Sequence, residues 1–242
     1  MNTNFNAINQ PFSNEITLDG NTYLYFGGTA YLGIPQNEDF IGLYLNGIRK
    51  FGLNNGTSRN NNIQLGIYNE AEKIASGRFG AEDALITSRG YLAAQLTVKA
   101  LSGFGEVIYA PATHPALWLD EQPLTTTNSF TDWKNETLGR INSSAQKNWV
   151  LISNSMNNLF PEVFDFGFVE LIDTDKNVTL IVDDSHGIGI NNNGLGALVG
   201  IPKRENVKVV VVASMAKAMG VDAGIVLGPK PIIDGLKNTS IF

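Results

Sequence analysis

The chain has 242 residues, of which 43% are hydrophobic and 17% charged, enough apolar material for one substantial core. Its net charge of −6 argues against a nucleic-acid partner or an anionic membrane surface, because both need a basic face. It contains no cysteine, which excludes disulfides and thiolate metal sites. No segment resembles a signal peptide or a membrane span, so a cytoplasmic location is the default expectation.

The first 35 residues predict an N-terminal segment with a small β-hairpin. Residues 15–26 alternate apolar and polar side chains around Asp19-Gly20, a dipeptide typical of a tight hairpin turn. We expect residues 36–242 to form one large α/β domain after this segment.

Two amphipathic helices are predicted next, because apolar side chains recur at helical spacing in two stretches. The first stretch presents Phe40, Tyr44, Ile48 and Phe51 on one face, and the second presents Ile67, Ala71, Ile74 and Ala75. Residues 51–64, FGLNNGTSRNNNIQ, are too rich in Asn and Gly for either helix or strand, so they predict a structured loop.

After Gly80, short apolar runs alternate with helical stretches. The runs ALITS, EVIYA, WVLISN, TLIVDD, VKVVVVAS and AGIVLG are rich in β-branched residues, and GYLAAQLTVKALS has a helical pattern. Such alternation is typical of an α/β fold. Because the runs lack polar alternation, we expect a mostly parallel sheet covered by helices on both faces.

The residues that follow these runs are the candidates for chemistry, because ligands of open α/β sheets bind beyond the carboxyl ends of the strands. They are Ser88, Gly90, His114, Asp183, His186, Ser214 and Lys217. Both histidines of the chain are among them. Taken singly, each has an ordinary explanation as a loop residue or, for Lys217, a solvated helix residue.

Lys217 stands out because it lies in SMAKAMG, where small and apolar neighbours solvate an ammonium poorly and favour the nucleophilic amine. Pyridoxal phosphate (PLP) needs a lysine for a Schiff base, an aspartate at the pyridine nitrogen, a flat group over the ring and N–H donors for the phosphate. This sequence supplies all four. Ser88-Arg89-Gly90 opens a predicted helix, whose N-terminus is a natural phosphate site.

These motifs resemble those of the α-oxoamine synthase family, the PLP-dependent acyltransferases of fold type I that include 8-amino-7-oxononanoate synthase, glycine acetyltransferase and serine palmitoyltransferase. The resemblance runs from about residue 22 to the end. SMAKAMG is similar to the family's Thr-x-Ser-Lys-Ala-x-Gly, which implies that Lys217 forms the Schiff base and Ser214 contacts the phosphate. Asp183-Asp184-Ser185-His186 is similar to Asp-Glu-Ala-His, which places Asp183 at the pyridine nitrogen and His186 at the ring oxygen.

Two further segments carry the resemblance. YAPATHPAL is similar to the segment whose histidine stacks on the cofactor ring, which implies that role for His114. TSRGYLAAQ is similar to the phosphate loop, which assigns Gly90 and Tyr91 to the phosphate beside Ser88. Arg89 and Ala216 depart from the family pattern, since serine is common at both positions.

The resemblance implies a biosynthetic acyltransferase that condenses an amino acid with an acyl-CoA thioester, with Lys217, His186 and His114 as catalytic residues. It implies a homodimer, because family sites are shared between subunits. It also implies a small C-terminal domain that closes the site and that is absent from this chain, because Phe242 follows soon after the lysine motif.

Other functions stay open on the sequence alone. Another PLP reaction, such as transamination, aldol cleavage or elimination, would use the same cofactor motifs. A non-catalytic or degenerate PLP-fold domain would also fit a chain without the closing domain. A metal triad of His114, His186 and Asp183 is conceivable but would leave Lys217 without a purpose, so we predict no metal.

Overall fold

The computed structural model describes residues 5–239, so the ends of the two predicted segments, residues 1–4 and 240–242, lie outside it. The described chain divides into two compact units. The first comprises residues 5–64 with Lys217–Val221, and the second comprises Leu65–Ala216 with residues 222–239. Within residues 5–239, no helix combines the length and the apolar composition needed to cross a membrane.

The first unit contains the predicted hairpin. Strands β1 (Glu15–Leu18) and β2 (Asn21–Leu24) pair in antiparallel register. Asp19 and Gly20 between them have φ angles of 51° and 76°, the left-handed pair that matches the twist of a two-residue hairpin. Helix α1 (Glu38–Phe51) follows, and it begins where the side chain of Asn37 accepts a hydrogen bond from the Phe40 N–H.

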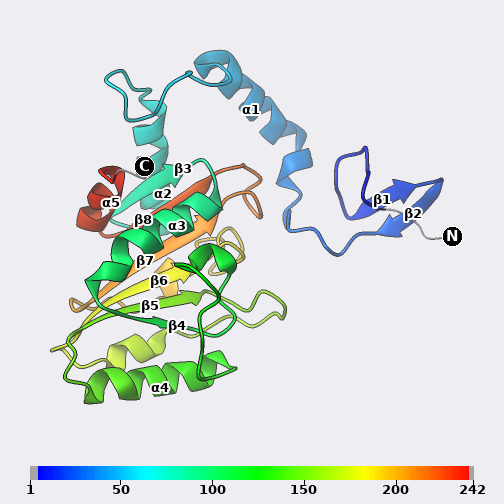
Figure 1. The fold of residues 1–242 in the computed structure, drawn as a ribbon. Coiled ribbons are helices and arrows are strands. Elements are labelled where there is room, and N and C mark those ends of the chain that lie inside the picture. Colours follow the sequence, from blue (N-terminus) through cyan, green and yellow to red (C-terminus); the bar gives the residue numbers. More distant parts are fainter. Residues whose placement is uncertain (1–4, 240–242) are drawn as a thin grey trace. The chain divides into compact units, whose positions relative to one another are not determined.

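The second unit is built on a six-stranded sheet with the order β3-β8-β7-β6-β5-β4 (Figure 1). Its strands are β3 (Asp83–Thr87), β4 (Glu106–Tyr109), β5 (Asn148–Asn154), β6 (Asn177–Asp183), β7 (Val207–Ser214) and β8 (Gly224–Gly228). Strands β4 to β7 are parallel, and β8 runs antiparallel to both of its neighbours. The predicted mostly parallel α/β sheet is therefore confirmed.

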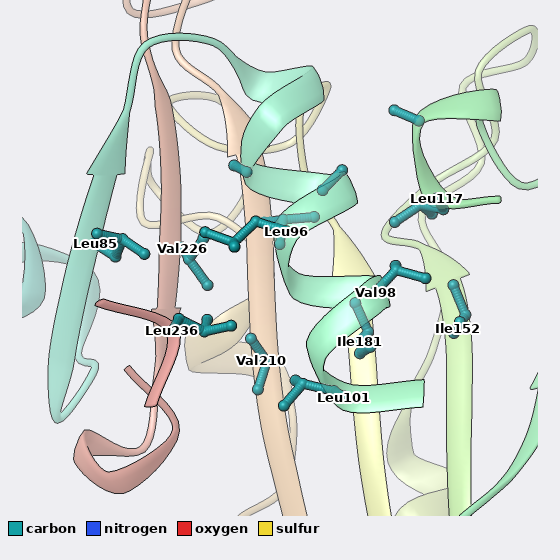
Figure 2. Packing of buried hydrophobic residues seen from close by; sticks show 14 of the residues in the cluster. Leu85, Leu96, Val98, Leu101, Leu117, Ile152, Ile181, Val210, Val226 and Leu236 are labelled. Atoms are coloured by element: carbon teal, nitrogen blue, oxygen red, sulfur yellow. The ribbon is translucent and has the colours of Figure 1, made fainter. Parts of the chain in front are cut away.

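One face of this sheet is covered by helix α3 (Gly90–Leu101), whose Leu96, Val98 and Leu101 pack onto the strands (Figure 2). The short helix α5 (Lys230–Lys237) adds Ile233 and Leu236 to the same cluster. The cluster also contains Leu117 from the segment after β4 and fully buried residues of five strands, including Leu85, Val150, Ile152, Ile181, Val210 and Val226. Burial of this apolar surface holds the strand ends in place.

Helix α4 (Phe130–Ser143) packs against the 3-10 helix η4 (Gly167–Leu171) through a cluster of aromatic side chains. The rings of Phe130 and Phe164 stack with centroids 4.2 Å apart, and Trp133 meets Phe168 edge to face. The Phe164 N–H also donates to the Ser155 carbonyl at 3.0 Å, so the cluster supports the segment just after β5.

Two details differ from the expectations. Helix α2 (Ile67–Phe79) buries Glu72, Ala75 and Phe79, whereas Ile74 is 63% exposed. The helix is rotated because Phe79 is the larger apolar anchor and Glu72 bonds to strand β3. The reversal of β8 was also not predicted, since an apolar run such as AGIVLG carries no signal of strand direction. Residues 52–64 form no regular helix or strand, as predicted.

Candidate cofactor site

The carboxyl ends of the parallel strands meet at one edge of the sheet, and the antiparallel β8 begins there. Gly224 pairs with both Thr87 at the end of β3 and Ser214 at the end of β7. Asn154 pairs with Asp183, so β5 and β6 also end side by side. Three of the predicted candidates, Ser88, Asp183 and Ser214, therefore belong to the same edge of the second unit.

The N-terminus of helix α3 provides the anion-binding end of this edge. Arg89 occupies the N-cap position in an extended conformation and makes no side-chain cap hydrogen bond. The first intrahelical bond runs from the Ala93 N–H to the Arg89 carbonyl, so the N–H groups of Gly90 and Tyr91 have no acceptor within the helix. Such N–H groups, together with the helix dipole, favour a phosphate.

The loop before α3 is shaped by two close contacts of glycine. A Cβ placed on Gly90 would lie 2.5 Å from the Cβ of Ser214, and one placed on Gly224 would lie 2.3 Å from the carbonyl oxygen of Arg89. The Thr87 hydroxyl also donates to this carbonyl, at 2.8 Å. Because these contacts leave no room for a side chain, the ends of β3, β7 and β8 hold the loop before α3 in one position.

Asp183 ends β6, where hydrogen bonds to its neighbours fix its backbone and its carboxylate. Its Oδ1 accepts from the Ser185 N–H at 2.9 Å, and its carbonyl accepts from the Ser155 N–H at 2.8 Å. The Ser185 hydroxyl accepts from the Ser214 N–H at 2.8 Å, which ties the turn after β6 to the end of β7. His186 follows in this turn and is half-buried.

Asp184, the next residue, faces the interior and is 1% exposed. Its Oδ2 accepts a hydrogen bond from the Ala197 N–H at 2.7 Å, closing the glycine-rich turn that follows. Burial raises the pKa of Asp184 to about 6, against the lowering effects of the Ser155 hydroxyl and the Ala197 N–H. A Cβ on Gly187 would lie 2.2 Å from Oδ1 of Asp184, so this carboxyl group and the turn are packed together.

His114 is exposed and lies at the N-cap of the 3-10 helix η3 (Pro115–Leu117). Its Nδ1 accepts a hydrogen bond from the Ala116 N–H at 3.1 Å. In the neutral ring, this bond places the proton on Nε2 and fixes the orientation of the imidazole. The His114 N–H donates to Oδ1 of Asn154 at 3.1 Å.

Lys217 belongs to the first unit. There the segment Lys217–Val221 packs against residues before α1, since a Cβ on Gly220 would lie 2.6 Å from Cγ2 of Ile34. In sequence, Lys217 follows Ser214 by three residues. The role assigned to it from the SMAKAMG motif stays a prediction, as do the other residue assignments.

Sequence reasoning missed Asn154, Thr87 and Gly224, which also shape this edge. Asn154 was the last residue of the predicted strand WVLISN, and its place at the carboxyl end of a strand could have identified it as a candidate. Among residues 5–239, no three His, Cys, Asp or Glu side chains are grouped as metal ligands, and we do not propose the metal triad.

These residues fit PLP. An uncapped helix N-terminus suits its phosphate, and a carboxylate at the end of β6, in the same sheet, suits a protonated ring nitrogen. Imidazole side chains at the same edge are suited to contacts with an aromatic ring and its oxygen. A mostly parallel sheet with this edge is the architecture of the large domain of PLP-dependent transferases of the aminotransferase type.

Comparison with known proteins agrees with that class. The family model described as aminotransferase class I and II matches residues 36–242. The chain belongs to this family, and the expectation of a PLP-dependent family is confirmed.

Curated relatives define the family more narrowly. The chain is 26% identical over 231 residues to a protein of Thermodesulfovibrio yellowstonii named putative 8-amino-7-oxononanoate synthase, covering 93% of this chain and 59% of the relative. It is 23% identical over 238 residues to the 8-amino-7-oxononanoate synthase of Chromobacterium violaceum, covering 96% and 61%. The predicted relation to the α-oxoamine synthases is confirmed, and the chain spans about three-fifths of the length of these relatives.

Solved structures share the fold. The serine palmitoyltransferase of Sphingomonas wittichii superposes with a TM-score of 0.78 at 21% identity, covering 96% of this chain and 59% of that protein. The 8-amino-7-oxononanoate synthase of Francisella tularensis superposes with a TM-score of 0.59 at 16% identity, covering 87% and 60%. The likeness shows the fold alone and confirms the predicted fold class.

Proposed function

We propose that this chain is the cofactor-binding part of a PLP-dependent acyltransferase that joins an amino acid to an acyl-CoA thioester. One observation carries the proposal: the uncapped N-terminus of α3 and the carboxylate of Asp183 belong to the same edge of one sheet. They match the phosphate and the ring nitrogen of PLP. The names of the relatives support the acyl-transfer chemistry.

The phosphate would be held by backbone and hydroxyl groups. The N–H groups of Gly90 and Tyr91 point out of the first turn of α3, and the hydroxyls of Ser88 and Ser214 lie at the ends of the neighbouring strands. Because Gly90 packs directly on Ser214, the two phosphate-binding segments have a fixed spacing. This preorganisation lowers the entropy cost of binding the anion.

The ring would be held by three side chains. The carboxylate of Asp183 keeps a proton on the pyridine nitrogen, and PLP with that proton withdraws electrons from the α-carbon of a bound amino acid. His114 covers one face of the ring, with its proton on Nε2 because Nδ1 accepts from Ala116. His186 donates to the ring oxygen.

Lys217 would attach the cofactor through Nζ. In the sequence it follows Ser214 by three positions, with Met215 and Ala216 between them. With the cofactor bound to a substrate amino acid, the Lys217 amine would be suited to act as the base for the α-proton. A homodimer and the binding of an amino acid and acyl-CoA belong to the proposal, and the cytoplasmic location stays a prediction.

The visible absorption spectrum of the purified chain with added PLP tests the cofactor assignment. We expect a yellow band that borohydride reduction fixes to Lys217, identified by mass spectrometry of the peptides. Lys217→Ala should lose the band. Lys99→Ala, which removes an exposed lysine of α3, should keep it. A folded chain without the band would overturn the proposal.

Release of free thiol from acyl-CoA in the presence of candidate amino acids tests the reaction. An acyltransferase releases thiol only when both substrates are present. The Lys217→Ala variant should release none. A chain that keeps the absorption band and forms no thiol with any acyl-CoA, but deaminates or cleaves the amino acid, is a different PLP enzyme.

A further inference from the structure

Asn154 is a buried polar residue to which sequence reasoning gave no role. It ends strand β5, is 4% exposed and pairs in register with Asp183 at the end of β6. A buried amide must find partners for both its oxygen and its nitrogen. The hydrogen-bond partners of the Asn154 amide lie about forty residues away in the sequence, in the turn that contains His114.

Both ends of the amide contact the same turn. Oδ1 of Asn154 accepts a hydrogen bond from the His114 N–H at 3.1 Å, and Nδ2 donates to the Ala112 carbonyl at 2.8 Å. One side chain thus spans the turn on either side of Thr113. An Asp could accept from His114 but would place a second acceptor opposite the Ala112 carbonyl.

The turn needs such support because its backbone is strained. Ala112 has a φ of 54°, in the left-handed region that non-glycine residues rarely adopt. A conformation of this kind persists only where the surrounding contacts fix it. Trp118 adds a second contact, because its Nε1–H donates to both the carbonyl and the hydroxyl of Thr113, at 3.1 and 3.2 Å.

The same residue connects the turn to the edge of the sheet where Asp183 lies. The Ser155 N–H, one residue after Asn154, donates to the Asp183 carbonyl at 2.8 Å. The backbone at Asn154 is therefore fixed to β6, while its side chain is fixed to the turn. Asn154 is therefore a direct connection between the His114 turn and Asp183, beside the Ala110 N–H that donates to the Ile152 carbonyl at 2.8 Å.

We propose that Asn154 is a positioning residue that holds the His114 turn on strand β6 and thereby orients the His114 ring. The hydrogen bond from the Ala116 N–H to Nδ1 of His114 continues directly from the turn that Asn154 holds, and we expect it to weaken when that turn loosens. Asn154 therefore also selects the Nε2–H form of the neutral ring. The role of His114 in binding PLP rests on the proposed function, but the orientation of its ring does not.

Nitrogen-15 NMR of the cofactor-free chain, labelled at histidine, tests this inference. The chain has only two histidines, so the rings of His114 and His186 give separate, assignable signals, and His114→Gln identifies them. We expect His114 in the wild type to show the Nε2–H form alone. In Asn154→Ala and Asn154→Asp, His114 should become a mixture of both neutral forms, with the His186 signals unchanged.

The matched control is Asn148→Ala, which removes an exposed asparagine at the opposite end of the same strand. It should leave both histidine rings unchanged. If Asn154→Ala does not fold, Asn154→Asp combined with Ala112→Gly relieves the strained φ and serves in its place. Ala112→Gly should restore folding, but His114 should remain a mixture of both neutral forms.

Two results would overturn the inference. A folded Asn154→Asp chain that keeps His114 wholly in the Nε2–H form would show that Asn154 does not orient the ring. Equal changes at His114 and His186 would show a general loss of structure instead of positioning. Since no cofactor is present, neither result depends on whether the chain binds PLP, which the absorption spectrum tests separately.

Discussion

Gly90 lies against Ser214 so closely that a Cβ added to Gly90 would stand 2.5 Å from the Cβ and 2.6 Å from the Cα of Ser214. The two residues come from motifs more than a hundred positions apart, the first turn of α3 and the end of β7. Their contact joins the two segments to which we assign the phosphate. The contact also requires a glycine at position 90, because a side chain would clash with Ser214. The reason is steric and not conformational, since the φ of Gly90 lies outside the left-handed region.

Gly90→Ala should therefore destabilise the chain by about 1–3 kcal/mol, the usual cost of overpacking a close contact. It should also weaken PLP binding, because α3 must move away from Ser214. Gly103→Ala is the control, since a Cβ there meets no atom within 4 Å. Urea denaturation and a PLP titration measure both effects. Equal stability of the two variants would contradict the prediction.

The buried Asp184 predicts a specific dependence of stability on pH. Its pKa is raised from 3.8 to about 6 in the folded chain, mainly by burial. Well below pH 3.8 the carboxyl is protonated whether the chain is folded or not, and its contribution to stability is fully present. As pH rises through 6, that contribution is lost, by about 3 kcal/mol for a shift of this size.

Asp184→Asn removes this titration and keeps the shape of the side chain. The difference in unfolding free energy between the variant and the wild type should shift in favour of the variant by about 2 kcal/mol between pH 4 and pH 7. Urea denaturation of both proteins at several pH values measures it. Subtracting the two curves removes the titration of the other acids, and a difference that does not change with pH would refute the assignment.

The ion pair between Glu72 and Lys237 joins helix α5 to helix α2, and we expect it to contribute to the stability of the chain. Glu72 is 2% exposed; its Oε1 accepts from the Ile86 N–H at 2.9 Å, and its Oε2 lies 3.1 Å from Nζ of Lys237. The Lys237 side chain is 26% exposed, so solvent screens the pair in part.

Lys237→Met should cost about 2 kcal/mol, less than the 3–5 kcal/mol typical when a fully buried pair is broken. Lys230→Met is the comparison, because Lys230 pairs with Asp234 at the surface, where solvent screens the ion pair and its contribution to stability is small. Thermal and urea denaturation give both values. The prediction is wrong if the two substitutions have the same effect.

Much of the fold follows from local patterns in the sequence. The six apolar runs after Gly80 became the six strands of the large sheet, because a buried strand must be apolar on both faces. Asp19-Gly20 specified its hairpin for an equally local reason: both residues tolerate the left-handed backbone that the turn requires. The strand ends at Asp183 and Ser214 were likewise predictable, since each follows its run directly.

The contacts that shape the site were decided by the tertiary structure. Asn154 reaches His114, Gly90 meets Ser214, and Glu72 turns helix α2 so that Ile74 faces outward. Each partner lies far along the chain, and no local pattern encodes such a distance. The sequence by itself determined which segments are strands and which residues end them. Which of those residues meet was decided by the packing of α3 and the order of the strands. The reason is physical: a hydrogen bond or a steric contact exists only between atoms that the fold has brought together.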